Sequence, residues 1–309
     1  MEEWSFRAEP RAPFQFTPHL ERFSLPGKHL PHLYVPEERA FEAAVRAGNS
    51  LAGVRAVIVG EPWRPRIRVS VYAPSRAAAG EAFETVMNMV RAGFDYNKFL
   101  EETARIDKRL YRLASKYPGL RPGRCTSLYA ALIDSVVKQR ITLRAALRTY
   151  SRLVEALGCR LQAGPRTFYW HPCPHTLAQQ TAESLRRLGL TRMKAQALIE
   201  IARAEEEGRL PRPEEAARDP WTAAQELTKL YGVGPWTAQL AIAMISPVFP
   251  LGPLSDLAVT RGLRIVAGCT DCQALARKIT REAPVYAGLI LYLAAYEYEE
   301  HKRGAHSAR

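Results

Sequence analysis

The stretch that decides the fold is Leu227-Thr-Lys-Leu-Tyr-Gly-Val-Gly-Pro-Trp-Thr-Ala-Gln239. One helical segment ends just before the two glycines, and a second begins after them. Gly232 and Gly234 allow backbone conformations and close approaches that other residues rarely tolerate. Pro235 suits the first turn of the second helix because its missing N–H needs no partner there. A turn this tight leaves several unpaired N–H groups on one convex surface, which predicts a binding site for an anion such as phosphate.

A second informative segment follows the hairpin. Pro247-Val-Phe-Pro-Leu-Gly-Pro-Leu-Ser-Asp-Leu-Ala-Val-Thr-Arg-Gly-Leu263 is a Pro- and Gly-rich loop that opens into a helix. Asp256 stands where this helix starts. An aspartate at such a position is most often an N-cap, so its position alone does not predict catalysis.

Hairpin, loop and aspartate together resemble the HhH-GPD superfamily of DNA glycosylases, which is named after these three features. The hairpin fits the pattern L-x-G-[VI]-G-x-x-T-A, and the loop fits P-x-x-D-x-x-[VI]-x-R-x-L. The matching residues are Leu230, Gly232, Val233, Gly234, Thr237, Ala238, Pro253, Asp256, Val259, Arg261 and Leu263. The resemblance implies a DNA-binding hairpin made of Tyr231, Gly232, Val233, Gly234 and Thr237. It also implies a monovalent cation, Na⁺ or K⁺, on the backbone carbonyls of Thr228, Leu230 and Val233.

The resemblance makes Asp256 the expected catalytic residue. Breaking an N-glycosidic bond builds positive charge on the sugar, and a fixed carboxylate facing that carbon stabilises the charge as it develops. The same carboxylate could orient or deprotonate the attacking water.

Trp236 occupies the position where bifunctional members of the superfamily carry the lysine that nicks the strand. An indole cannot form a Schiff base, so the resemblance implies a monofunctional enzyme of the AlkA-like 3-methyladenine glycosylase branch. An electron-poor alkylated purine stacks well on aromatic faces. Trp236 and Tyr292 are the expected walls of the base pocket, and Leu240 is expected to line it. For Tyr292, packing in an apolar helix is an equally good interpretation.

Reaching a base inside a duplex requires flipping it out of the stack. The segment 136–142 matches the family's wedge region, which makes Gln139 and Arg140 the candidate wedge residues. Arg144 and Arg148 continue a basic stripe on one helix face, and Lys138 extends it. We therefore expect Arg144, Arg148 and Lys138 to contact phosphates, the alternative being a solvated basic face.

The pattern along the chain predicts two domains and a tail. Residues 1–104 should form an α/β domain, with a strand hairpin over 54–59 and 67–72 and a helix over 77–92. It resembles the small TBP-like domain of the branch. Residues 105–300 should be all helical, without strands, forming a glycosylase core of two subdomains, and residues 301–309 a polar tail. The expected core helices are 126–139, 142–157, 175–188, 192–207, 221–230, 235–245, 256–267, 272–281 and 284–300.

The 309 residues include 44 Lys and Arg against 31 Asp and Glu, a formal charge of +13. Such an excess favours a polyanionic partner, although the Arg-rich surface of a thermophilic protein is an alternative. The five cysteines are scattered and do not form the pattern of a disulfide framework, which predicts a reducing compartment. We expect a cytoplasmic, prokaryotic location. No apolar run is long enough to span a membrane, and the start of the chain does not resemble a secretory signal. Cys269 and Cys272 have no further cysteines after them, so no iron–sulfur cluster is implied.

The sequence therefore predicts a monomeric, monofunctional glycosylase that excises alkylated purines from damaged double-stranded DNA, without a catalytic cofactor. One alternative is a glycosylase for hypoxanthine, oxidised or mismatched bases. Another is a non-catalytic protein that binds DNA through the hairpin alone.

Overall fold

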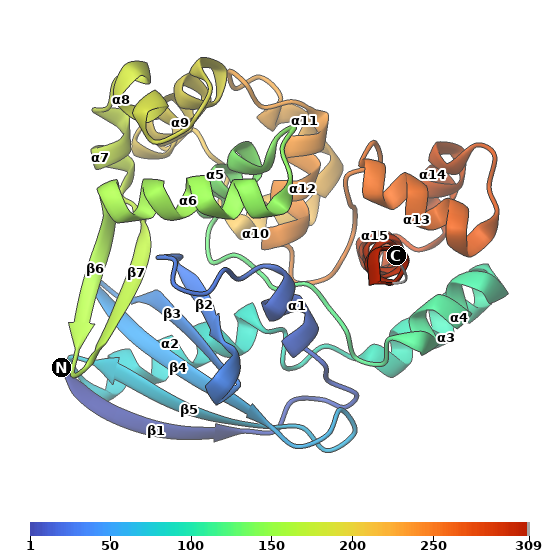
Figure 1. Ribbon diagram of the computed structural model, residues 1–309, viewed down its shortest axis with the longest axis horizontal. Coiled ribbons are helices and arrows are strands. Elements are labelled where there is room, and N and C mark those ends of the chain that lie inside the picture. Colours follow the sequence, from blue (N-terminus) through green and yellow to red (C-terminus); the bar gives the residue numbers. More distant parts are fainter. Residues whose placement is uncertain (308–309) are drawn as a thin grey trace.

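The computed structural model describes residues 1–307 (Figure 1). Its N-terminal part is an antiparallel sheet in the order β1-β5-β4-β3-β2. The strands are β1 (Glu2–Ala8), β2 (His32–Val35), β3 (Ala40–Ala47), β4 (Ser50–Val59) and β5 (Arg66–Ala73). The predicted hairpin is confirmed, since Val54 of β4 pairs with Val71 of β5. Alternate residues of β5 are buried, as expected for a strand with one face on a core. Helix α2 (Arg76–Met89) packs against the sheet, close to the predicted helix.

The connection from sheet to helices differs from the expected boundary at residue 104. Helix α3 (Tyr96–Ile106) crosses that boundary, and α4 (Lys108–Lys116) follows it directly. Tyr96 and Phe99 of α3 are fully buried against residues of the C-terminal helices rather than against the sheet. The Tyr96 hydroxyl donates to the carbonyls of Ala114 and Tyr117, which fixes the two helices together. By packing, the helical part therefore begins near residue 95.

The first helical subdomain surrounds α5 (Leu128–Lys138), whose residues 128–137 are all buried. A helix that is apolar on every side belongs in the middle of a bundle. Around it lie α6 (Leu143–Leu157), α7 (Pro174–Ala178), α8 (Ala182–Arg187), α9 (Arg192–Glu206), α10 (Pro213–Arg218), α11 (Pro220–Leu227) and α12 (Pro235–Ile245). The single helix expected over 175–188 is two short ones, because Thr181 starts α8 with a capping box. Among the described residues, no helix is long and apolar enough to cross a membrane.

The second helical subdomain consists of α13 (Leu257–Ala267), α14 (Cys272–Glu282) and α15 (Ala287–Ser307), with α3 and α4 packed on it. Helices α13 and α15 cross in close contact at Gly262, where a Cβ atom would lie 1.8 Å from the Ala294 carbonyl oxygen. The expected polar tail begins inside α15, since residues 301–307 continue this helix, and residues 308–309 lie outside the described part.

The expectation of an all-helical region without strands is wrong over residues 158–172. Strands β6 (Gly158–Ala163) and β7 (Arg166–Pro172) form a hairpin that leaves the helices and runs down to the N-terminal sheet (Figure 1). Phe168 and Trp170 of β7 are buried against Ala44 of β3. Thr, Phe, Tyr and Trp favour strands, and the Gly164–Pro165 pair favours a turn, so the local signal was present. The remaining prediction, a mainly helical protein with a small N-terminal α/β domain, is confirmed.

The sequence did not predict the disulfide that joins Cys269 and Cys272 just before α14. The two residues stand in a tight turn, with Asp271 capping the helix that follows. Cys125, Cys159 and Cys173 are free thiols.

Candidate functional site

A cavity of about 330 Å³ lies where the N-terminal domain meets both helical subdomains. Helices α1 (Thr17–Arg22), α5, α12, α13 and α15 contribute to its walls, together with the loop 247–253. All four residues expected at the catalytic centre and base pocket line it: Trp236, Leu240, Asp256 and Tyr292. A largely apolar cavity with a few converging polar groups is the usual form of a small-molecule site.

Asp256 is the N-cap of α13 and also lines the cavity. Its Oδ1 accepts hydrogen bonds from the backbone N–H groups of Ala258 (2.8 Å) and Val259 (3.2 Å). Its Oδ2 accepts a bond of 2.8 Å from Nε1 of Trp236. The capping role and a role at the cavity are therefore compatible, because each oxygen has its own partner and the carboxylate is fixed in one orientation.

Trp236 stands in the first turn of α12, directly after Pro235, with Gly234 as the N-cap. One turn further on, the Oε1 of Gln239 accepts a bond of 3.1 Å from the backbone N–H of Leu254. The start of α12 is thus tied to the Pro- and Gly-rich loop at two points. This connection sets the distance between the hairpin and the carboxylate.

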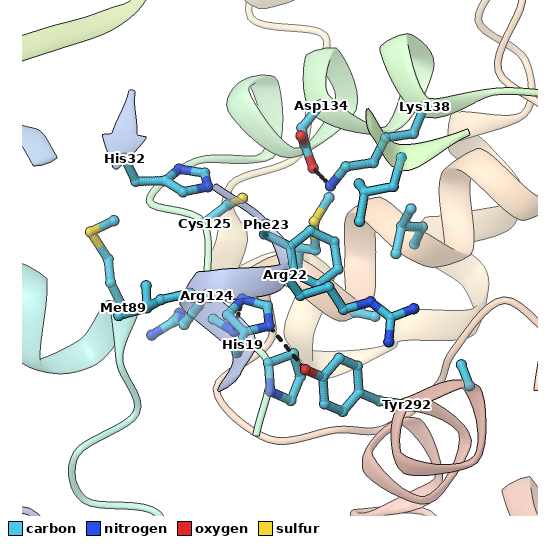
Figure 2. Close-up of a pocket in the computed structure, with 18 of the residues that line it drawn as sticks. His19, Arg22, Phe23, His32, Met89, Arg124, Cys125, Asp134, Lys138 and Tyr292 are labelled. Carbon is cyan, nitrogen blue, oxygen red and sulfur yellow. Dashed lines mark hydrogen bonds and ion pairs between the residues drawn. The ribbon is translucent and has the colours of Figure 1, made fainter. Parts of the chain in front are cut away.

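Tyr292 of α15 lies next to His19 of α1 in the cavity wall (Figure 2), with 3.0 Å between its hydroxyl and Nδ1. The backbone N–H of Gly123 donates to Nε2 of the same ring at 3.0 Å, so the neutral ring carries its proton on Nδ1 and donates to Tyr292. Burial, followed by the neighbouring His32 and nearby cations, lowers the pKa of His19 well below its usual value. A neutral histidine therefore holds the tyrosine ring at the cavity wall.

Lys138 was expected to contact phosphates, and the structure corrects this prediction. Its ammonium group points into the cavity and forms an ion pair with Asp134, one turn earlier on α5 (Figure 2). The two side chains are only 16% and 10% exposed. The ammonium nitrogen also lies 4.9 Å from the centre of the Phe23 ring. Arg144 and Arg148 are exposed on α6, as a phosphate contact requires.

The two candidate wedge residues have different environments. The Nε2 of Gln139 donates to the carbonyl of Gly232 (2.9 Å) and to the hydroxyl of Thr237 (2.8 Å), so this side chain braces the hairpin. Arg140 is exposed and has a φ of +52°, a left-handed conformation that a non-glycine residue adopts rarely. Ile141, which follows, is 42% exposed and lines the cavity. Arg140 is the exposed member of the expected pair, and sequence reasoning missed Ile141.

The hairpin has the tight turn that the glycines predict. Gly232 has a φ of +74°, and a Cβ atom there would lie 2.6 Å from the Cβ of Ala197. At Gly234 a Cβ atom would meet nothing within 4 Å, so its backbone faces open space. Val233 and Thr237 are buried, and they support the turn rather than face a partner with their side chains. Tyr231 is exposed on the convex side, and its hydroxyl donates to Gln196 (3.0 Å).

The carbonyls of Thr228, Leu230 and Val233 belong to the turn after α11. The Leu230 carbonyl already accepts the Val233 N–H at 3.1 Å, which leaves one of its lone pairs for a cation. Within the described residues, no three or more His, Cys, Asp or Glu side chains gather as metal ligands.

Several cavity residues were not found from the sequence. His19, Phe23 and His32 come from the N-terminal domain, where the short α1 and β2 give no functional signal. Asp134 did give one, because it is a lone carboxylate in an otherwise apolar helix and stands four residues before a lysine.

Comparison with known proteins agrees with this geometry. A family model described as "HhH-GPD superfamily base excision DNA repair protein" matches residues 133–284. A DNA-3-methyladenine glycosylase of Bacillus subtilis (strain 168) is 28% identical over 187 residues, covering 59% of this chain and 61% of the relative. DNA-3-methyladenine glycosylase 2 of Escherichia coli (strain K12) is 30% identical over 133 residues, covering 43% and 46%. The match thus covers about three fifths of the length of the Bacillus relative and less than half of the length of the Escherichia coli relative.

Solved structures show the same fold over nearly the whole chain. A 3-methyladenine DNA-glycosylase from Archaeoglobus fulgidus superposes with a TM-score of 0.79 at 21% identity, covering 94% of this chain and 98% of that one. An 8-oxoguanine glycosylase/lyase from Clostridium acetobutylicum gives 0.72 at 16% identity, covering 96% and 98%. The family model, the hairpin and the aspartate together assign residues 133–284 of this chain to the HhH-GPD superfamily of base excision DNA repair proteins.

Proposed function

We propose that this protein is a monofunctional DNA glycosylase that hydrolyses the N-glycosidic bond of damaged purines, alkylated ones among them, in duplex DNA. The observation that carries the proposal is the carboxylate of Asp256, held at the cavity by two backbone N–H groups and by the indole of Trp236. The relatives named as 3-methyladenine glycosylases support the reaction class. Neighbours in fold include an 8-oxoguanine enzyme, so the fold favours no single lesion.

In this mechanism the damaged nucleotide leaves the stack and its base enters the cavity beside Trp236 and Tyr292. As the bond to the base breaks, positive charge develops on the sugar, and the fixed Asp256 carboxylate stabilises it. A water molecule attacks C1′, assisted by the same carboxylate. The products are the free base and an abasic site in an intact strand.

DNA binding is assigned to the surface around the hairpin. The backbone at Gly234 would accept a phosphate, because nothing lies within 4 Å of the position its Cβ would take. Arg144 and Arg148 would add phosphate contacts, and Arg140 would fill the gap left by the flipped base. A Na⁺ or K⁺ ion on the turn carbonyls would help to position the phosphate.

The test is Asp256→Asn. Asparagine also caps helices well and keeps an oxygen for the two backbone N–H groups, so the fold and DNA binding should persist. The amide has no negative charge and turns a donor toward the indole N–H. Base release in single turnover should fall about a hundredfold or more.

Two measurements decide between the candidate functions. Strand breaks at lesions that appear only after alkali treatment are expected of a monofunctional enzyme, whereas breaks without alkali would identify a lyase. If the parent protein releases no base, it is a DNA-binding protein only. If Asp256→Asn releases bases at the parental rate, Asp256 is not the catalytic residue.

A further inference from the structure

The ion pair of Asp134 and Lys138 has no part in the mechanism so far, yet it lies in the wall of the base cavity. The residues are one turn apart on α5, the central helix of its subdomain. Taking two charges out of water costs free energy that their attraction barely offsets, so such a pair rarely contributes much stability. A buried pair in a cleft is therefore a candidate for function.

Two titratable groups near the pair, His32 and Cys125, are uncharged. Burial lowers the pKa of His32 and raises the pKa of the Cys125 thiol to about 12, so both groups are neutral near pH 7. The Phe23 ring packs near the ammonium group of Lys138 (Figure 2). In this setting the ion pair presents an N–H donor and a carboxylate acceptor side by side in the cavity wall.

The charge balance of the cavity wall disfavours a cationic base. Its charged lining residues in the described part are Arg22, Arg124, Asp134, Lys138 and Asp256, which gives three cations against two carboxylates. A base that is itself positively charged gains nothing from an additional ammonium group. A neutral purine with a carbonyl oxygen offers that group an acceptor.

We propose that Lys138, positioned by Asp134, donates a hydrogen bond to the carbonyl of a neutral oxopurine, such as hypoxanthine, in the cavity and stabilises that base as it leaves. This inference rests on the proposed glycosylase function and specifies its substrate class. Lys138 acts here as a catalytic residue that touches the base, and Asp134 acts as a positioning residue.

The chemistry explains why a neutral base needs this donor. When the C1′–N9 bond breaks, the electron pair stays on the purine, which becomes an anion if it started neutral. A hydrogen bond from the ammonium group spreads that charge through the carbonyl. Water then forms the new C1′–O bond, and its second proton ends on the released base. A cationic base such as 7-methylguanine leaves as a neutral molecule and places no such demand on Lys138.

The test compares two duplexes, one with a single hypoxanthine and one with a single 7-methylguanine, in single-turnover base release. For Lys138→Met, the ratio of hypoxanthine to 7-methylguanine rates should fall about tenfold or more from the parental ratio. Lys138→Arg keeps a donor and should restore part of the ratio. Asp134→Asn should lower the ratio in the same direction, because the ammonium group loses its anchor.

Lys278→Met is the matched control. Lys278 also pairs with a carboxylate four residues away, Glu282, but this pair is exposed on α14 and does not line the cavity. The ratio should remain parental in this variant. Thermal unfolding and duplex binding of every variant show whether a loss of activity reflects a loss of fold.

Each result has one meaning. If Lys138→Met lowers both rates equally, or changes neither, Lys138 does not act on the leaving base. A covalent complex with DNA trapped by borohydride through Lys138 would also overturn the inference, because the lysine would then be a nucleophile. A parent protein that releases only 7-methylguanine refutes the inference but leaves the glycosylase function standing. If the parent protein releases neither base, the proposed function itself is refuted. The same holds if the Asp256→Asn variant releases both bases at the parental rates.

Discussion

The indole N–H of Trp236 and the carboxylate of Asp256 restrict each other. The bond between Nε1 and Oδ2 is 2.8 Å long and connects the first turn of α12 to the first residue before α13. Since the other carboxylate oxygen is engaged by the backbone of α13, the indole is the side-chain donor that fixes the second one. Trp236 would thus both stack on the base and orient the carboxylate.

Replacing Trp236 by phenylalanine separates these two roles. Phenylalanine retains an aromatic face but has no N–H, so the carboxylate loses one of its donors. We expect single-turnover base release to fall about tenfold, with duplex affinity largely retained. Trp63→Phe is the control, because Trp63 is 58% exposed on the N-terminal domain. Parental rates in Trp236→Phe would mean that the backbone alone positions Asp256.

At this scale the sequence was informative where a short pattern constrains the chain. Trp236, Leu240, Asp256 and Tyr292 could be proposed from local motifs, and all four line one cavity. The environment of Lys138 was predicted wrongly. Helical spacing shows on which face of a helix a residue lies, but not which other elements pack on that face. The sequence could not distinguish the roles of Gln139 and Arg140, because the hydrogen bonds of Gln139 go to residues more than ninety positions away.

At the scale of elements, the crossing of α13 and α15 sets the geometry of the site. Asp256 caps α13 and Tyr292 lies on α15, so the distance between these helices determines the width of the cavity. At Gly262 the absence of a side chain lets the helices meet backbone to backbone. The sequence showed the two helices but not this contact, since a glycine within a helix has no unique interpretation.

Gly262→Ala should destabilise the protein. Its Cβ would overlap the carbonyl of Ala294, so the helices must separate, and we expect the free energy of unfolding to fall by at least about 2 kcal/mol. Gly80→Ala in α2 is the matched control. No atom lies within 4 Å of its Cβ position, and it should stabilise by about 0.5 to 1 kcal/mol. Chemical denaturation of both variants measures the two shifts, and equal shifts would contradict a tight crossing at Gly262.

At the scale of the whole molecule, the cavity belongs to no single domain. His19 from α1 bonds Tyr292 from α15, 273 positions later, and the β6–β7 hairpin packs on the sheet. Figure 1 shows the β6–β7 hairpin reaching from the helices to the N-terminal sheet, and Figure 2 shows the bond between His19 and Tyr292. Such pairings between distant segments leave no trace in local periodicity, which is why the role of the N-terminal domain could not be predicted. The disulfide before α14 was missed because cysteine count and spacing do not show whether two thiols meet.

The junction between the domains contains buried, neutral histidines. Burial lowers the pKa of His171 from its ordinary 6.5 to about 3, with His32 adding to the shift and Asp134 opposing it. The ring of His171 is hydrogen-bonded through Nδ1 to the Tyr150 hydroxyl. His19 and His32 are shifted in the same direction. The unfolded chain therefore binds more protons than the folded protein below pH 6.5.

This difference makes stability depend on pH with a definite sign. Because the folded protein keeps His171 neutral, the stability it contributes is present above pH 6.5 and is lost as pH falls toward 3. Between pH 7 and pH 5, His171 alone should lower the free energy of unfolding by about 2 kcal/mol. Carboxyl groups with lowered pKa, such as Asp107, respond mainly at lower pH. Burial raises the pKa of Glu205, so the comparison with a His171 variant is needed to isolate the histidine.

Urea unfolding of the parent protein and His171→Asn at pH 7 and pH 5 measures this effect. The variant starts less stable, because the Tyr150 hydroxyl loses its partner, but it should lose about 2 kcal/mol less between the two pH values. His301→Asn removes an exposed histidine and should follow the parent. A parent protein equally stable at both pH values, or the same loss in His171→Asn, would show that His171 is not held neutral. The two domains would then be joined without the cost of keeping a histidine uncharged between them.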